Sequence, residues 1–225
     1  MRNGMISLLS LAREDAAILG QAQVENEYVF FAYASDLQSV VSELSKTATL
    51  IEYQEQYGIE IQTPEKSKTQ DAWRKTTLRI RKTIPASGFP DTKKLKNQKE
   101  ATYEQAIKVP LPSDHGGVKS KEIPTQSCHD AFLVIQEIAT MGMCKIRYTL
   151  PSEFPGRSYE YDLMINKEGD PVGFFKIDLE IPDKLPSAPK LVEGFDRVVY
   201  RQRSERTSEE NEFIDKYWKT ACRII

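Results

Sequence analysis

Charged side chains alternate with apolar or aromatic ones in several short segments of the chain. Arg79 and Arg81 occur in TTLRIRKT, and Lys145 and Arg147 occur in CKIRYTL. Residues two apart in a strand point to the same face of a sheet, so each segment has one charged face and one apolar face. The pattern recurs in segments that contain Glu25 and Glu27, Lys108, Glu160 and Asp162, and Lys176, Asp178 and Glu180. This recurrence predicts a sheet whose strands share one charged, functional face.

The same alternation, together with helical spacing of apolar residues elsewhere, predicts the secondary structure. Strands are expected over residues 24–34, 72–84, 101–109, 143–150, 158–165 and 172–181, and helices over 5–20, 35–46, 127–141 and 207–221. Residues 48–62 fit either a helix or a strand, with strand favoured near 49–54 and 58–62. The stretches 85–100 and 110–126 are rich in Lys, Pro and Gly, which is typical of exposed loops.

The apolar faces of these strands need cover, which the amphipathic helices supply if they pack on the outside of a curved sheet. The charged faces then point inward. Because burying an ion in a dry interior costs several kcal/mol, the interior must be wet, must pair acids with bases, and is suited to an ionic ligand. We therefore expect an α+β fold built on an antiparallel, closed β-barrel or tunnel of about eight strands with a charged interior. A single domain is expected over 1–225, with a helical extension at 1–23, the tunnel at 24–181 and a C-terminal helical segment at 190–225.

Composition narrows the class of protein. The 225 residues carry a net charge of −2, which does not suit a general nucleic-acid binder. The three cysteines form no CxxC pair and no zinc-type cluster with the two histidines. No stretch approaches the roughly 20 apolar residues of a membrane helix, and residues 1–20 do not resemble a signal peptide. These features predict a cytoplasmic protein that does not act at a membrane.

The order of the charged segments resembles that of the CYTH family, the triphosphate tunnel metalloenzymes. The family's opening ExExK motif is similar to ENEYV at 25–29, and its basic strands are similar to LRIR at 78–81, AIK at 106–108 and KIRY at 145–148. Its acidic strands are similar to YDL at 161–163 and DLE at 178–180. Two positions depart from the family pattern. Val29 stands where the motif has a lysine that points into the tunnel, and Asp178 shortens one carboxylate of the late ExE motif.

The resemblance implies a divalent-metal-dependent hydrolase of a triphosphate-containing substrate. Inorganic triphosphate, a nucleoside triphosphate, thiamine triphosphate and an RNA 5′ end all remain open as substrates, and adenylyl cyclase activity is a less favoured variant. The implied roles are substrate binding by Arg79, Arg81, Lys108, Lys145 and Arg147, Mg²⁺ or Mn²⁺ binding by Glu25, Glu27, Asp162, Asp178 and Glu180, and catalysis by Glu25, Glu27 and Glu180. Arginine suits phosphate because its planar fork donates two hydrogen bonds, and hard divalent ions prefer carboxylate oxygens.

Other interpretations remain open on the residues alone. The loss of the motif lysine at Val29 favours a module that binds a nucleotide or a phosphorylated ligand in the same tunnel without turnover. The charged pairs could also be cross-strand salt bridges on a solvated face, in which case the protein is an interaction scaffold. A homodimer that forms through the apolar outer faces of the strands also remains open.

Overall fold

The computed structural model describes residues 23–64, 73–98, 100–111, 118–180, 189–199 and 206–224. The helix expected over 5–20 lies outside these residues. The strands are β1 (Gln23–Tyr33), β2 (Leu50–Pro64), β3 (Trp73–Pro85), β4 (Thr102–Leu111), β5 (Val118–Gln126), β6 (Met141–Pro151), β7 (Ser158–Ile165), β8 (Pro171–Glu180), β9 (Arg197–Val199) and β10 (Cys222–Ile224). The helices are α2 (Leu37–Thr47), α3 (Thr92–Lys96), α4 (His129–Ile138) and α5 (Ser208–Ala221).

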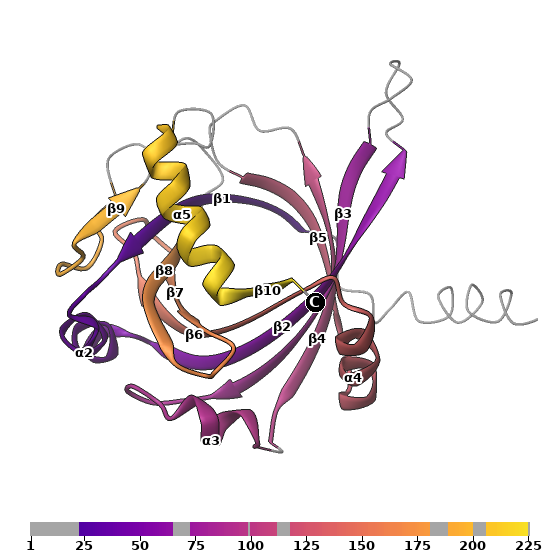
Figure 1. Cartoon of the computed structure of the whole chain (residues 1–225), viewed down its shortest axis with the longest axis horizontal. Helices are drawn as coiled ribbons and strands as arrows, with labels where there is room; N and C mark the ends of the chain where they lie inside the picture. The colour runs from indigo at the N-terminus through magenta and orange to yellow at the C-terminus, as the bar shows by residue number, and fades with distance from the viewer. Residues whose placement is uncertain are drawn as a thin grey trace, which may run out of the picture.

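The long strands close into a ring. Hydrogen-bonded neighbours run in the order β6–β2–β3–β4–β5–β1–β8–β7, and β7 pairs in turn with β6. Every pairing in the described part of the chain is antiparallel, and the short β9 and β10 extend the ring at β1 and β6. Figure 1 looks into this ring, with α2, α3 and α4 on its outside and α5 across its front. The expected closed antiparallel barrel with flanking helices is confirmed.

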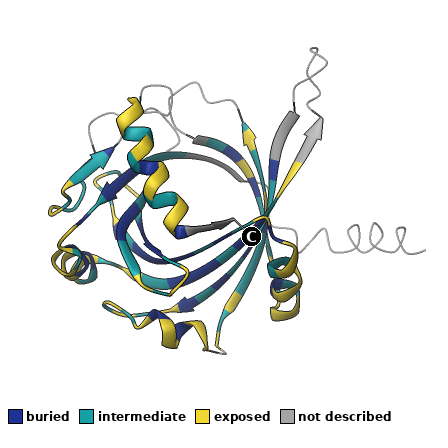
Figure 2. Ribbon diagram, in the orientation of Figure 1, coloured by how far each residue is buried: buried dark blue, intermediate teal, exposed yellow. Residues whose placement is uncertain are grey.

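The main apolar core lies between the barrel and its outer helices. Outward side chains of the strands, such as Ile146, Tyr148 and Leu163, pack together with Val41 and Leu44 of α2 in one buried cluster. A second cluster joins β2 and β3 to α4 in the same way, around buried Tyr57, Ile80 and Phe132. Burial follows the predicted alternation on the covered strands, whereas Ile107 on β4 faces outward and is 42% exposed (Figure 2).

One end of the barrel is filled with apolar side chains. Phe31 and Phe174 occupy inward positions on β1 and β8, and α5 contributes Tyr217 and Trp218 to the same cluster. Ring centroids lie 6.0 Å apart for Phe31 and Trp218, and 5.4 Å apart for Phe174 and Tyr217. The predicted apolar side of the last helix therefore packs across this end of the ring, which leaves the charged positions in the middle of the barrel and at its other end.

Two local expectations need correction. Residues 110–126 are not one loop, because residues 118–126 form β5 and pair with both β1 and β4. Residues 48–62 are neither helix nor two short strands, since one long strand, β2, covers 50–64. In both places tertiary pairing outweighs polar composition and weak local preference. Within the described ranges, no helix is long and apolar enough to cross a membrane.

Candidate functional site

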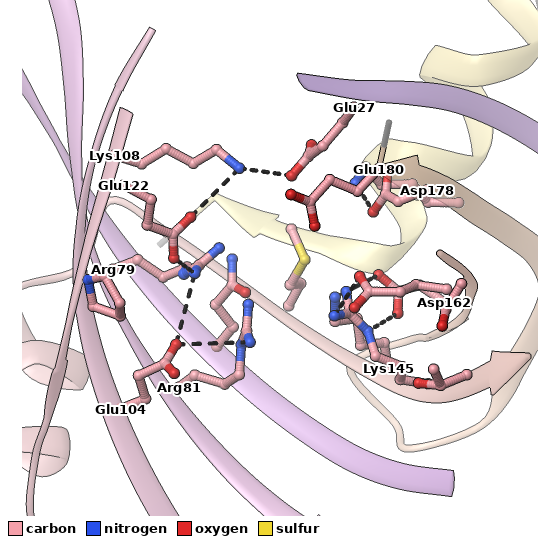
Figure 3. Close-up of a pocket in the computed structure, with 18 of the residues that line it drawn as sticks. Glu27, Arg79, Arg81, Glu104, Lys108, Glu122, Lys145, Asp162, Asp178 and Glu180 are labelled. Atoms are coloured by element: carbon pink, nitrogen blue, oxygen red, sulfur yellow. Dashed lines mark hydrogen bonds and ion pairs between the residues drawn. The ribbon is translucent and has the colours of Figure 1, made fainter. Parts of the chain in front are cut away.

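A charged cavity of about 720 Å³ lies inside the barrel. All of the expected site residues except Glu25 line it, and the side chain of Glu25 lies outside the described part of the structure. Figure 3 shows basic side chains reaching in from β3 and β4 and acidic ones from β1 and β8 on the facing side. The lining also contains charged residues that were not assigned to the site from the sequence, namely Glu104, Glu122, Arg157, Glu160 and Lys176.

The basic side of the cavity is formed by β3, β4 and β5. Arg79 donates to the buried carboxylate of Glu122, whose other oxygen lies 3.6 Å from Lys108 Nζ. Lys108 also donates to Glu27 Oε1 across 3.0 Å, which joins the basic side to the acidic one. Arg79 and Lys108 therefore each have a close carboxylate partner.

Arg81 has the weakest counter-charge on this side. Its nearest recorded carboxylate is Glu104, whose oxygen lies 3.8 Å from Nη1 and whose side chain is 43% exposed. The Arg81 Nε atom is buried and has no hydrogen-bond partner among the described residues. Burial, helped by the positive charges of Arg79 and Arg147, lowers the pKa of Arg81 to about 10. Arg81 stays protonated at neutral pH, and an anion in the cavity would stabilise its charge.

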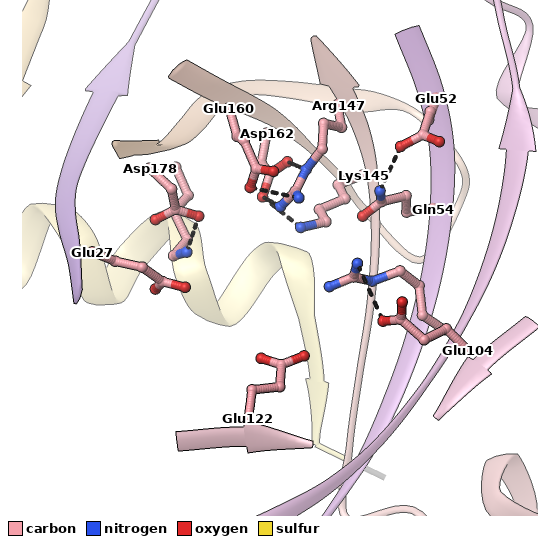
Figure 4. A network of polar contacts seen from close by, with 12 residues as sticks. Glu27, Glu52, Gln54, Glu104, Glu122, Lys145, Arg147, Glu160, Asp162 and Asp178 are labelled. Carbon is pink, nitrogen blue, oxygen red and sulfur yellow. Dashed lines mark hydrogen bonds and ion pairs between the residues drawn. The ribbon is translucent and has the colours of Figure 1, made fainter. Parts of the chain in front are cut away.

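A buried ion cluster on β6 and β7 borders the cavity (Figure 4). Arg147 donates to both oxygens of Asp162, with distances of 2.7 Å from Nε to Oδ1 and 2.8 Å from Nη2 to Oδ2, and Lys145 Nζ also donates to Oδ2. Burial opposes the charge of Asp162, but Arg147 and Lys145 outweigh it and lower the pKa of this carboxyl. Burial and the neighbouring Arg147 lower the pKa of Lys145, although Asp162 opposes this. Both Asp162 oxygens thus accept from cations, and a metal ion at Asp162, as expected from the sequence, would have to compete with Arg147 and Lys145.

The acidic side of the cavity lies on β1 and β8. Glu27 is the cross-strand partner of Glu180, and Val29 is the partner of Asp178. Lys176, two residues before Asp178 on β8, donates to Asp178 Oδ2. Burial opposes the charge of Lys176, but Asp178, Glu27 and Asp162 raise its pKa. Lys176 therefore places a positive charge next to Asp178, the cross-strand partner of Val29.

These carboxylates suit a divalent cation in their chemistry. Asp178 is 5% exposed, and its Oδ1 atom has no hydrogen-bond partner among the described residues. Glu27 and Glu180 present further carboxylate oxygens to the same side of the cavity, and such hard donors are what Mg²⁺ and Mn²⁺ prefer. No three acidic, His or Cys side chains in the described residues already stand together as a metal site. A metal would have to compete with Lys176 for Asp178 and with Lys108 for Glu27.

Unpartnered polar atoms concentrate inside the barrel. Within the described residues, the buried side-chain atoms that lack a partner are Ser45 Oγ, Gln54 Oε1, Arg79 Nε, Arg81 Nε, Ser120 Oγ and Asp178 Oδ1. All of these except Ser45 Oγ belong to inward positions of barrel strands, judged by their register with the cavity residues. Since buried polar groups normally find partners, this concentration indicates a site that is completed by water, ions or a ligand.

Comparisons with known proteins give similarity at the level of fold. No protein family and no curated protein matches the chain. Similar solved structures include HpAC1 from Hippeastrum, described as a candidate adenylyl cyclase with a dominant triphosphatase activity, at 14% identity and a TM-score of 0.42, covering 71% of this chain and 80% of that one. They also include the PH1819 protein from Pyrococcus horikoshii OT3, at 16% identity and a TM-score of 0.38, covering 86% of each chain. Similarity this low transfers no function.

The charged lining residues that the sequence did not indicate were missed for different reasons. Glu122 and Glu104 lie beside prolines, lysines and glutamines that conceal the alternation, and Glu122 falls in the stretch interpreted as a loop. Glu160 and Lys176 were visible in the alternating pattern, but nothing in the sequence separated them from surface charge. Arg157 lies between β7 and the preceding turn, outside any strand, so no period-two signal marks it.

Proposed function

We propose that the cavity binds a triphosphate-containing substrate against its basic side and hydrolyses it with a divalent cation held at its acidic side. The observation that carries this proposal is the concentration of unpartnered buried atoms on opposite sides of one cavity. Arg79 Nε and Arg81 Nε are donors that lack an acceptor, whereas Asp178 Oδ1 is an acceptor that lacks a donor. A phosphate chain supplies acceptors to the first two, and a metal ion accepts electron pairs from the third.

The chain's own residues would position the substrate. Arg79 and Arg81 share one face of β3 and can hold neighbouring phosphoryl groups, while Asp162 fixes the Arg147 guanidinium and so leaves it little freedom. The acidic side repels the phosphate chain and keeps it against the basic one. Glu27, Asp178 and Glu180 would hold Mg²⁺ or Mn²⁺, which when bound neutralises phosphoryl charge and lowers the pKa of a bound water. Such catalysis depends mainly on positioning and electrostatics.

Turnover is tested by phosphate release from inorganic, nucleoside and thiamine triphosphates in Mg²⁺ or Mn²⁺, with EDTA as the metal-free comparison. We expect release that requires metal and that falls at least about a hundredfold in Glu27→Gln, since a carboxylate contributing to the charge balance of the site is lost. Glu193→Gln removes the same charge from an exposed position and should leave the rate unchanged. Equal inactivity of wild type and Glu27→Gln on every substrate would sink the hydrolase proposal.

The second candidate function is capture of a triphosphate or nucleotide without turnover. Lys176 favours it, because this lysine already neutralises Asp178 and so occupies part of the acidic side. Under this alternative the ligand binds equally well in EDTA and raises the melting temperature by mass action, but no phosphate is released.

A further inference from the structure

A second chamber, also of about 720 Å³, adjoins the charged cavity. It lies where β3 ends and β4 begins, at the end of the barrel opposite the α5 cluster, and it shares Arg81, Glu104 and Pro124 with the cavity. A ligand held by Arg81 would therefore lie at the boundary between the two spaces. Each space is of the size that encloses a small organic molecule, so together they exceed what a bare triphosphate chain fills.

The chamber differs from the cavity in charge. Apart from Arg81, no Lys or Arg among the described residues lines it. Besides Ala101 and Pro124, the lining consists of acids, amides, hydroxyls and one aromatic residue, including Glu52, Gln54, Thr83, Thr102 and Tyr103. Such a surface offers no further cation to additional phosphate groups, and it suits an uncharged or electropositive group.

Gln54 is the most informative residue of the chamber. It is 2% exposed, and its Nε2 atom donates to Glu52 Oε2 across 3.0 Å. This hydrogen bond fixes the amide, as Figure 4 shows, so that Gln54 Oε1 points away from Glu52. No described residue donates to Oε1. A buried carbonyl without a donor is costly, and beside it stands a carboxylate, so the chamber presents two adjacent acceptors to whatever enters.

We propose that this chamber binds the organic head group of the substrate, a nucleoside-like group that donates hydrogen bonds from an amino group or a sugar hydroxyl to Gln54 and Glu52. This inference rests on the proposed function, since it assumes that the phosphates lie in the cavity. It narrows the substrate to an organic triphosphate and makes inorganic triphosphate a weaker ligand. Gln54 acts as a specificity-determining residue that does not touch the phosphates.

Calorimetric titration in EDTA, where no turnover occurs, tests this with inorganic triphosphate and ATP as probes. Wild type should bind ATP about tenfold more tightly than inorganic triphosphate, as expected for one or two hydrogen bonds to buried acceptors. Gln54→Leu should lose that preference while keeping its affinity for inorganic triphosphate within about twofold. Gln105→Leu, the same substitution at an outward position of β4, should keep the preference.

Two further ligands show whether the adenine amino group or the sugar hydroxyl of ATP donates the hydrogen bond to Gln54. Inosine triphosphate lacks the adenine amino group and deoxyadenosine triphosphate lacks the 2′-hydroxyl, so the one that binds as weakly as inorganic triphosphate identifies the group that meets Gln54. Equal affinity of wild type for ATP and inorganic triphosphate would overturn the inference, as would a preference that survives in Gln54→Leu. If no triphosphate binds to wild type, the proposed function itself fails, which is a distinct result from the loss of the preference alone.

Discussion

Replacement of Asp162 by alanine is expected to lower the free energy of unfolding by roughly 3–5 kcal/mol, because it leaves buried cations without their counter-charge. Asp162 is fully buried, and it accepts from both Arg147 and Lys145. Glu160 compensates only in part, since its side chain is 38% exposed and its one recorded ion pair is with Arg147 and not with Lys145. For a chain of this length the change corresponds to a fall in melting temperature of roughly 6–20 °C.

Denaturant and thermal unfolding of Asp162→Ala measure this effect. The matched control is Asp170→Ala, which removes the same side chain from an exposed pair with Lys93 and should cost no more than about 1 kcal/mol. High phosphate or triphosphate should restore part of the stability of Asp162→Ala by supplying anions to the uncompensated cations. Equal stability of the two variants would show that the Arg147–Asp162–Lys145 cluster does not hold the barrel interior together.

Lys176→Met is expected to bind Mn²⁺ at least about tenfold more tightly than wild type does, because it removes a positive charge from the carboxylates proposed to hold the metal. Lys176 Nζ donates to Asp178, and the negative charges of Asp178 and Glu27 raise its pKa, so it is charged at neutral pH. A lysine and a divalent ion cannot both bind Asp178 at full strength. The wild-type protein should therefore bind metal weakly until the substrate brings additional negative charge.

The register of β1 and β8 offers a compensating change for the same experiment. Val29 is the direct cross-strand partner of Asp178, so a lysine at 29 can reach the same carboxylate. Adding Val29→Lys to Lys176→Met should return the Mn²⁺ affinity toward the wild-type value, while Lys121→Met, at an exposed position, should leave it unchanged. The free Mn²⁺ signal in electron paramagnetic resonance measures each affinity. Unchanged or weaker binding by Lys176→Met would show that Lys176 does not compete with the metal.

The sequence predicted part of the barrel interior, because residues two apart in a strand point to the same face of the sheet. The alternation of basic and buried apolar residues within β3 and β6 placed four basic side chains on one face of the sheet. These are Arg79, Arg81, Lys145 and Arg147. The closure of the ring was harder to predict, because the β2–β6 and β1–β8 pairings that complete it join strands far apart in the sequence. The expectation of a closed barrel came from the charged strand faces, which needed a shared wet interior, and the strand pairing confirms it.

Pairing inside the site could not be predicted, since it depends on register across strands. The sequence did not reveal that Asp162, in register with Arg147, accepts hydrogen bonds from both Arg147 and Lys145. Glu122 lies in a lysine-rich segment without clear alternation, so both its strand and its contact with Arg79 were missed. The short strands β9 and β10 were not predicted either, because three residues carry too little periodic signal to indicate a strand.

The most direct test of the barrel as a triphosphate site is a calorimetric titration of inorganic triphosphate into wild type, Arg81→Met and Lys121→Met. Both variants lose one positive charge, but Arg81 faces the cavity with little counter-charge, whereas Lys121 is exposed on the outward face of β5. The account predicts binding of one triphosphate per chain, a loss of roughly 10–100-fold in Arg81→Met and no loss in Lys121→Met. Equal affinities in the two variants, or no binding to wild type, would contradict it.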